Sequence, residues 1–380
     1  MYSLRDYGEM IADRERFEAY RQAIAQAVRP GDVVLEVGCG PGVFALLACR
    51  AGARKVYAID SGEIVHHARE LAVANGLADR LEFLHGDSRK VQLPERVNVI
   101  VSDIRGSLPF FDHAICTIED ARQRFLAPGG IMIPGRDILR AAVIDASEYY
   151  SRLISPWGTY ESGFDLSSSL PLILNACYST HFKADQLLTE SKDWCVLNYK
   201  TGAAANAAGD LCFKATRAGA AHGICVWFET VLADGIGFST GPSDKRSVYG
   251  QRFFPWPQAV SLEAGQEIQV SLHADLVGED YIWRWETKIS GDANGAGRHF
   301  QQSTFQGANF TPQALRKRAA DFVPALSEDG RADRWLLQEM DDKASLQQIA
   351  KAAAQQFPKI FPRWEDALRR AADLAAQFSR

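Results

Sequence analysis

The stretch VVLEVGCGPGVFALLACRAGARKVYAID, residues 33–60, decides the fold of this chain. Its apolar start, Asp32–Val37, predicts a buried strand that runs into a turn of alternating glycines. A segment of helical composition follows, and a second apolar run ends at Asp60. These elements occur in the order that a nucleotide-binding βαβ unit requires, which is a strand, a glycine turn, a helix, a second strand and an acidic residue. The stretch therefore predicts a parallel sheet with a nucleotide site at the glycine turn.

The alternation of strands and helices continues beyond this stretch. Apolar runs at Leu81–Leu84 and Val97–Ser102 predict two more strands, and Gly62–Asn75 and Thr117–Leu126 have helical composition. Apolar residues at three- and four-residue spacing predict a helix over residues 1–30, and Ala127–Gly130 reads as a turn. The alternation predicts an α/β domain whose parallel sheet is covered by helices.

After Pro134 the pattern changes twice. From about residue 138 to 290, alternating segments rich in β-branched and aromatic residues predict a mostly antiparallel β-domain. From Thr311 the composition becomes rich in Ala, Gln, Arg and Leu, which predicts a small helical unit. We therefore expect three domains, at residues 1–135, 136–310 and 311–380.

Composition excludes several classes of function. The chain has 42 basic and 47 acidic residues, so it lacks the basic excess that general nucleic-acid binding needs. Its apolar runs are too short to span a membrane, which takes about 20 residues. Seven cysteines without a CxxC pair favour reduced thiols and a cytoplasmic protein. No HExxH, CxxC or carboxylate–histidine spacing predicts a metal, and His66-His67 is expected on a surface helix.

The form of the glycine turn indicates which nucleotide is bound. Dinucleotide folds usually carry GxGxxG, whereas this chain has Glu36-x-Gly38-x-Gly40-x-Gly42. That form resembles motif I of class I S-adenosylmethionine-dependent methyltransferases. His85-Gly86-Asp87 and Val99–Asp103 resemble two later motifs of the same family. The resemblance implies a Rossmann-like methyltransferase sheet and S-adenosyl-L-methionine as the cofactor.

A narrower resemblance, to the protein arginine methyltransferases, extends over residues 7–290, about three quarters of the chain. Four separated blocks carry it: Glu9-Met10-Ile11-x-Asp13-x-x-Arg16-x-x-x-Tyr20-Arg21, Ala51-Gly52-Ala53-Arg54-Lys55-Val56, Phe125-Leu126-Ala127-Pro128-Gly129-Gly130-x-x-x-Pro134-x-Arg136 and Gly237-Phe238-Ser239-Thr240-x-Pro242. In that family the β-rich half is a barrel-like substrate domain, and an arm from it makes a head-to-tail dimer. Trp157–Leu166 lies where that arm would be, which implies a homodimer.

The resemblance also implies the cofactor contacts. Arg16 is expected to pair with the methionyl carboxylate and Met10 to lie near the sulfonium. Asp60 is expected at the ribose, and Asp87 with Ser88 at the adenine. The predicted cofactor-binding set is Met10, Arg16, Glu36, Gly38, Gly40, Gly42, Asp60, Ser61, Asp87, Ser88 and Asp103.

The acceptor side keeps an acidic pair. A guanidinium has a pKa above about 12 and no free lone pair, so methylating it calls for two carboxylates that orient it and help dispose of the proton. The family supplies two glutamates after the fourth strand, and the matching positions here are Asp103 and Asp112. Alternatively, Asp103 only contacts the cofactor, or Asp112 only favours a helix N-terminus.

Two departures from the family pattern concern the acceptor. Arg105, at a position apolar in the family, lies between the two acids, where it could pair with either one and repel a guanidinium. The Thr-His-Trp loop of the family falls on Ser247-Val248-Tyr249, without a histidine. If the acceptor is a guanidinium, Arg105→Met is expected to hold or improve activity. The predicted catalytic set is Asp103, Arg105, Asp112 and Tyr249.

The sequence thus favours an enzyme that methylates a guanidino nitrogen of a peptide or protein. Residues 320–378 are similar to winged-helix peptide-recognition domains of enzymes that modify ribosomally made peptides, which implies a precursor-peptide substrate; a capping helical bundle without a partner is the other interpretation. A different nucleophile, including a carboxylate-bearing or small-molecule acceptor, remains open. So does a non-catalytic homologue that keeps only the cofactor site.

Overall fold

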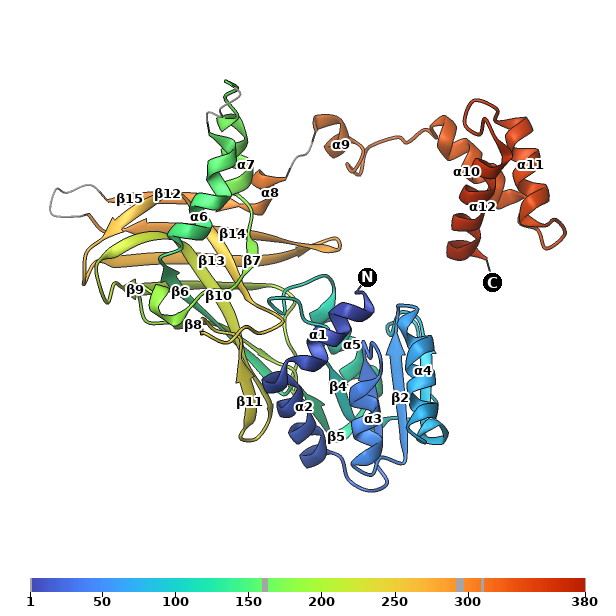
Figure 1. Cartoon of the computed structure of the whole chain (residues 1–380), viewed down its shortest axis with the longest axis horizontal. Coiled ribbons are helices and arrows are strands. Elements are labelled where there is room, and N and C mark those ends of the chain that lie inside the picture. The colour runs from blue at the N-terminus through green and yellow to red at the C-terminus, as the bar shows by residue number, and fades with distance from the viewer. Residues whose placement is uncertain (1, 159–162, 292–296, 309–310, 380) are drawn as a thin grey trace. The chain divides into compact units, whose positions relative to one another are not determined.

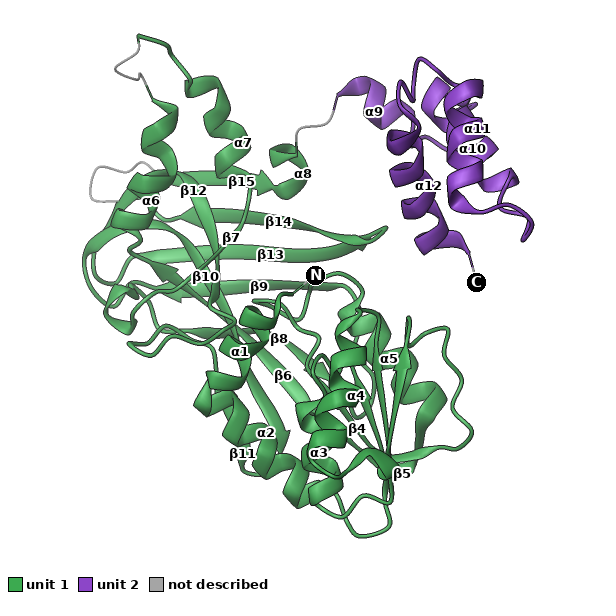
Figure 2. Cartoon of the chain, turned by 45° about the vertical axis from the view of Figure 1, so that its right-hand side comes forward, with its two compact units in different colours: residues 1–309 green, residues 310–380 purple. Residues whose placement is uncertain are grey.

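The computed structural model describes residues 2–158, 163–291, 297–308 and 311–379. The chain divides into two compact units, residues 1–309 and 310–380 (Figure 2). The parallel sheet and the β-rich region both belong to the first unit, and the C-terminal helices form the second. The division falls beside the boundary predicted at 310/311. The boundary predicted at 135/136 lies inside the first unit and stays a prediction.

The first sheet is parallel throughout and has the order β3-β2-β1-β4-β5. Figure 1 labels β2, β4 and β5 of this sheet. Its strands are β1 (Val33–Val37), β2 (Lys55–Asp60), β3 (Leu81–His85), β4 (Val97–Ser102) and β5 (Leu126–Ile133). All five residues of β1 are buried, as expected for a strand covered on both faces. The strand order reverses between β1 and β4, and ligands of such sheets bind where the carboxyl ends diverge at that point. The glycine turn follows β1 and Asp103 follows β4, so the order brings them to this edge.

Five helices accompany this sheet: α1 (Leu4–Ala12), α2 (Arg14–Ala27), α3 (Val43–Arg50), α4 (Ile64–Ala74) and α5 (Ala114–Phe125). The single helix predicted over residues 1–30 is two helices, because Asp13 has an extended backbone at φ −68° and ψ 91°. Its carboxylate caps α2 by accepting the Arg16 N–H at 3.2 Å. The break places Arg16 in the first turn of α2. The turn predicted at Ala127–Gly130 is part of β5, whose pairing with β4 is irregular there.

The β-rich region forms two antiparallel sheets, which agrees with the prediction. The first has the order β7-β12-β10-β6-β8 with β11 paired to β10, and the second has the order β15-β14-β13-β9. The strands are β6 (Arg136–Ile144), β7 (Tyr178–Thr180), β8 (Lys192–Asn198), β9 (Ala207–Lys214), β10 (Gly219–Ala233), β11 (Ile236–Ser239), β12 (Gln251–Leu262), β13 (Glu267–Val277), β14 (Asp280–Ile289) and β15 (Arg298–Ser303).

A helical insertion between β6 and β7 was not predicted. It contains α6 (Ser147–Ile154) and α7 (Leu170–Leu174), and α8 (Thr304–Gly307) follows β15. The predicted dimer arm, Trp157–Leu166, falls in this insertion, and residues 159–162 of it lie outside the described residues.

The second unit is helical, as predicted. Its helices are α9 (Pro312–Arg316), α10 (Glu328–Gln338), α11 (Leu346–Gln356) and α12 (Trp364–Phe378). Ser345 caps α11 and shares a reciprocal capping box with Gln348. Residues 311–379 contain no strand, so the hairpin of a winged-helix domain is not among them. No described helix of the whole chain is long and apolar enough to cross a membrane.

Candidate active site

The glycine turn after β1 needs glycine at each of its three positions. Gly38, Gly40 and Gly42 all have left-handed backbones, with φ of 71°, 50° and 75°. A Cβ at residue 38 would lie 2.1 Å from Cγ2 of Ile104, which follows β4. A Cβ at residue 40 would lie 2.6 Å from the ring of Tyr7 on α1. The backbone of the turn therefore lies so close to Ile104 and Tyr7 that only glycine fits there.

Two predicted acids lie beside this turn and differ in what they hold. Asp60 at the end of β2 accepts the Gly40 N–H at 2.7 Å and the Gly62 N–H at 2.8 Å. Glu36 is buried and accepts the Ala45 N–H at 2.7 Å in the first turn of α3. Burial raises the pKa of Glu36 well above its ordinary value. Asp60 is thus presented at the turn, whereas Glu36 ties α3 to β1.

The residues predicted at the adenine and ribose follow β2 and β3. Asp87 forms an ion pair with Arg89 at 2.9 Å, and hydrogen bonds from Arg89 lower the Asp87 pKa. Ser88 is buried, and its carbonyl accepts from Arg124 at 2.6 Å. The Ser61 carbonyl lies 3.1 Å from Nε2 of His85. All three lie at one edge of the sheet, and their roles toward the cofactor stay predictions.

Arg16, Asp103 and Tyr249 form the centre of the site. Nε of Arg16 donates to Oδ2 of Asp103 at 2.7 Å, and Nη2 lies 2.5 Å from the same oxygen. The Tyr249 hydroxyl donates to that oxygen at 2.5 Å and accepts from Nε of Arg16 at 3.0 Å. Nη1 of Arg16 donates to the Met10 carbonyl at 3.0 Å. Arg16 of α2 and Tyr249 of the loop before β12 therefore meet at the Asp103 carboxylate. The Met10 carbonyl of α1 holds the other side of the Arg16 guanidinium.

The other carboxylate oxygen of Asp103, Oδ1, accepts hydrogen bonds from Arg105. Nε and Nη2 of Arg105 lie 3.2 Å and 3.1 Å from Oδ1 of Asp103. Burial opposes the charge on Asp103, but Arg16 and Arg105 outweigh it, so the pKa of Asp103 lies below its ordinary value. Burial also raises the pKa of Tyr249, and the adjacent Asp103 adds to this shift, so Tyr249 stays a neutral donor. Both oxygens of the predicted catalytic acid are thus already bonded within the protein.

Arg105 is a buried structural cation and not a free charge in an open pocket. Its side chain is 1% exposed, and Nη1 donates to Asp137 on β6 at 2.7 Å and to Thr230 on β10 at 3.0 Å. Nη2 donates to the Tyr20 hydroxyl of α2 at 2.7 Å. The expectation that Arg105 pairs with one of the two predicted acids holds for Asp103. No ion pair between Arg105 and Asp112 is present among the described residues.

Sequence reasoning found Asp103 as a partner of Arg105 but missed the other partners. Asp137 is fully buried and also accepts from the Tyr199 hydroxyl at 2.8 Å, while Tyr20 donates to the Ser102 carbonyl at 3.2 Å. These residues come from distant parts of the chain, so no local spacing connects them to the glycine turn. The one available signal is an unexplained arginine after β4, which requires a buried acid in the folded protein.

Asp112 lies outside this network. It is exposed and has a left-handed backbone at φ 44°, which aspartate tolerates better than most residues. Partial loss of solvent around its carboxyl group raises the Asp112 pKa, and the charges of Asp280 and Glu279 at the β13–β14 turn add to the shift. Burial also raises the pKa of Tyr2, and the negative charges of Asp103 and Asp112 add to that shift. The charges of both predicted acids thus act on the Tyr2 hydroxyl.

Comparisons with known proteins agree with this geometry. A model described as a methyltransferase domain matches residues 34–130, and one described as an arginine methyltransferase oligomerization subdomain matches residues 136–280. Protein arginine N-methyltransferase 1 of Schizosaccharomyces pombe is 32% identical over 69% of this chain and 79% of its own length. The chain belongs to the protein arginine methyltransferase family. A relative from Arabidopsis thaliana is 39% identical, but that match spans 43% of this chain and 38% of the relative.

Solved structures show the same fold. The Trypanosoma brucei PRMT1 enzyme–prozyme heterotetrameric complex with AdoHcy matches with a TM-score of 0.72 and 22% identity over 78% of this chain and 97% of the matched chain. Arabidopsis thaliana protein arginine methyltransferase 10 matches with a TM-score of 0.70 and 22% identity over 79% and 97%. This arginine methyltransferase family member is an S-adenosylmethionine-dependent methyltransferase.

The residues at the sheet edge between β1 and β4, where the strand order reverses, suit this cofactor. The left-handed glycines keep the backbone of the turn free of side chains, and Asp60 offers a carboxylate for hydroxyl groups. Arg16, with two oxygen partners already in reach, is a fork that matches a carboxylate. When bound, S-adenosylmethionine supplies the methyl group, and these side chains are the ones expected to hold and orient it.

We expect Asp60→Ala to weaken binding of S-adenosylhomocysteine by about 1–3 kcal/mol. The change removes a carboxylate that accepts two backbone N–H groups and is predicted to accept from the ribose. Calorimetric titration measures the difference, with Asp87→Ala as the comparison at the adenine side. Unchanged affinity in Asp60→Ala would remove Asp60 from the ribose role.

Proposed function

We propose that this methyltransferase transfers the methyl group to a guanidino nitrogen of an arginine in a peptide or protein. The observation that carries the proposal is the Asp103 carboxylate, which follows β4 and is held in place by Arg16 and Tyr249. Asp112, in the loop that continues from it, is the second predicted acid. Asp280 and Glu279 add negative charge beside Asp112. Clustered carboxylates attract a cationic group and orient its nitrogens toward the donor.

The pairing of Arg16 with Asp103 fits a site that changes partners when the cofactor binds. The methionyl carboxylate competes with Asp103 for the Arg16 guanidinium, and taking Arg16 away frees Oδ2 of Asp103. Arg105 remains on Oδ1 and keeps the carboxyl group in place. Tyr249, which falls on the tryptophan of the family's Thr-His-Trp loop, holds Oδ2 by its hydroxyl. We propose that the acceptor guanidinium then binds at Oδ2 and at Asp112.

A second candidate is an acceptor that carries a carboxylate. Arg252 on β12 donates to the Ser179 hydroxyl at 2.8 Å and contacts the Ser107 hydroxyl at 3.4 Å. Ser107 belongs to the loop between Asp103 and Asp112, and Arg252 has no carboxylate partner among the described residues. Arg252 therefore favours an anionic group somewhere on the acceptor, either on the methylated molecule or beside its arginine.

The proposal is tested by a radiolabelled-methyl assay with a set of peptides. The set pairs each arginine peptide with its lysine counterpart and includes carboxylate-bearing small molecules. Transfer to the arginine members alone supports the proposal, whereas transfer to a carboxylate supports the second candidate. Cofactor binding without transfer to any acceptor would make the protein a non-catalytic homologue.

We further propose that the second unit recognises part of a ribosomally made precursor peptide. Its helices bury a small core, and Leu337 and Leu346 remain 36% exposed beside it. Candidate peptides encoded beside the gene can be incubated with enzyme and donor and analysed by mass spectrometry. Leu337→Asp, with Lys343→Asp as a surface control, is expected to reduce methylation of the full peptide but not of a short arginine peptide.

A homodimer is expected through the Trp157–Leu166 region, and the matched oligomerization subdomain supports assembly. Phe164 and Leu166 in this region are exposed apolar residues that a partner surface would cover. Light scattering of the purified protein should give twice the chain mass of 42.0 kDa. A mass near that of one chain at micromolar concentration would contradict the dimer. We place the enzyme in the cytoplasm and expect no nucleic-acid partner.

A further inference from the structure

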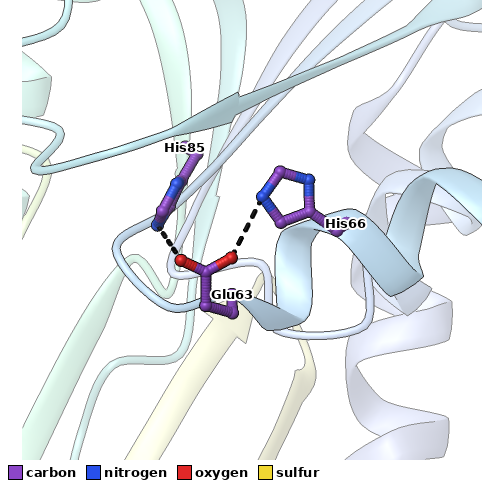
Figure 3. A group of neighbouring side chains, drawn as sticks. All are labelled: Glu63, His66 and His85. Atoms are coloured by element: carbon purple, nitrogen blue, oxygen red, sulfur yellow. Dashed lines mark ion pairs between the residues drawn. The ribbon is translucent and has the colours of Figure 1, made fainter. Parts of the chain in front are cut away.

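Two histidines and a glutamate converge at the edge of the first sheet, near the residues predicted to hold the cofactor ribose. Glu63 directly precedes α4, His66 lies in the first turn of that helix, and His85 ends β3. Figure 3 shows both imidazoles directed at the Glu63 carboxylate. Nε2 of His66 is 3.1 Å from Oε2, and Nε2 of His85 is 4.0 Å from Oε1. The three potential ligand atoms lie within 4.8 Å of one another.

Their chemistry is that of a zinc site with an open position. Zinc in proteins takes imidazole nitrogens and carboxylate oxygens at about 2.0–2.2 Å, and a set of two histidines and one glutamate leaves a fourth position for water. Tetrahedral geometry at those bond lengths separates neighbouring ligand atoms by about 3.4 Å. The three potential ligand atoms lie within 4.8 Å of one another, so rotation of these exposed side chains would bring them to that separation.

The backbone that carries these ligands is firmly placed. Val65 and Ala68 of α4 are fully buried next to the ligand-bearing turn, and β3 pairs in register with β2 up to His85. The ligands themselves are exposed, so an ion and its water can enter from solvent. The site therefore needs no rearrangement of the fold.

Protons occupy the ligand nitrogens in the present arrangement. Nδ1 of His66 lies 2.7 Å from Nη1 of Arg69, which can only donate, so the His66 proton is on Nε2 and points at Glu63. Nε2 of His85 lies 3.1 Å from the Ser61 carbonyl and donates to it. A metal ion takes the place of these protons and releases them.

Arg69 opposes that exchange. When Nε2 of His66 binds a metal, Nδ1 carries the proton and faces a donor of Arg69, whose other nitrogen is held by the Phe83 carbonyl at 2.7 Å. Arg69 also brings a positive charge toward the ion. We propose that Glu63, His66 and His85 bind one divalent transition-metal ion of the zinc class, and that Arg69 limits its affinity. This proposal does not depend on the identity of the methyl acceptor.

The experiment is a calorimetric titration of Zn²⁺ into the full chain and its variants. His85→Ala and Glu63→Gln are expected to weaken the site at least about 100-fold, because loss of even an outer-shell partner costs 10–100-fold. His67→Ala is the matched control, since His67 lies beside His66 on α4 but pairs with Glu70. Other groups that bind zinc, such as the exposed thiol of Cys212, are common to all these proteins.

Arg69→Met provides the second arm and should raise Zn²⁺ affinity by about tenfold or more, on the scale of outer-shell effects. Circular dichroism confirms that each variant is folded, so a change in affinity reports on the site. Equal Zn²⁺ binding by the native chain, His85→Ala and Glu63→Gln would overturn the metal site. A metal site that Arg69→Met leaves unchanged or weakens would overturn the role assigned to Arg69.

Discussion

Arg105→Met is expected to destabilise the protein by about 3–5 kcal/mol, the range for breaking a buried ion pair from one side. The change leaves Asp137 and Asp103 buried without the guanidinium that compensates both charges. It also removes donors from Thr230 and Tyr20. Sequence alone favours the opposite outcome, in which a competing cation is removed and activity holds. The structure changes that expectation because the cation is enclosed between the two parts of the first unit.

Urea unfolding measures this effect. Arg21→Met is the control, because the ion pair of Arg21 with Glu18 lies on the surface and contributes little to stability. Arg105→Met combined with Asp137→Leu should recover part of the loss by removing one orphaned charge. A loss in Arg105→Met no larger than in the control would contradict the buried role.

The same network gives stability a pH dependence. The pKa of Asp103 is lowered in the folded protein, so the carboxylate stabilises the fold fully above its unfolded pKa. That contribution is lost as the pH falls through the depressed folded value. Asp103→Asn should therefore remove part of the acid sensitivity of unfolding, together with turnover.

The second large effect is expected at Asp112. Asp112→Asn should lower kcat/KM by about 10²-fold or more, the scale of a lost acid–base or orienting group. The side chain is exposed and has no part in the Arg16–Asp103–Arg105 network, so stability and S-adenosylhomocysteine affinity should stay close to native. Steady-state kinetics with calorimetry separates these quantities.

Asp280→Asn is the matched control for Asp112→Asn, because it removes a neighbouring carboxylate whose charge acts on Asp112. A general electrostatic role would give similar losses in both variants, mainly in KM. An orienting role specific to Asp112 gives a far larger loss in kcat for Asp112→Asn. Equal, small effects would remove Asp112 from the catalytic set.

Local sequence predicted those parts of the fold that depend on neighbouring residues. The apolar runs around Val34 and Ile100 and the glycines between Gly38 and Gly42 specify strands and a turn by periodicity and backbone freedom. Parallel pairing then brings the turn and Asp103 to one edge of the sheet. The convergence of Arg16 on that edge was suggested by the family resemblance and not by spacing.

The rest depended on contacts between distant residues. Arg105 pairs with Asp137 and Thr230 because β6 and β10 of the β-rich region pack beside the loop after β4. No pattern in either segment encodes that meeting. The break at Asp13 was missed for a different reason, since helical periodicity continues on both sides of a residue that caps one helix and ends another.

The most direct test of the account is the position of the transferred methyl group. An arginine peptide that the enzyme accepts is incubated with S-adenosylmethionine, and the modified residue is analysed by fragmentation mass spectrometry. The native enzyme should add the methyl group to a guanidino nitrogen, and Asp112→Asn should yield about 10²-fold less of the same product. A methyl group found on a carboxylate, or on the lysine counterpart in place of arginine, would contradict the account.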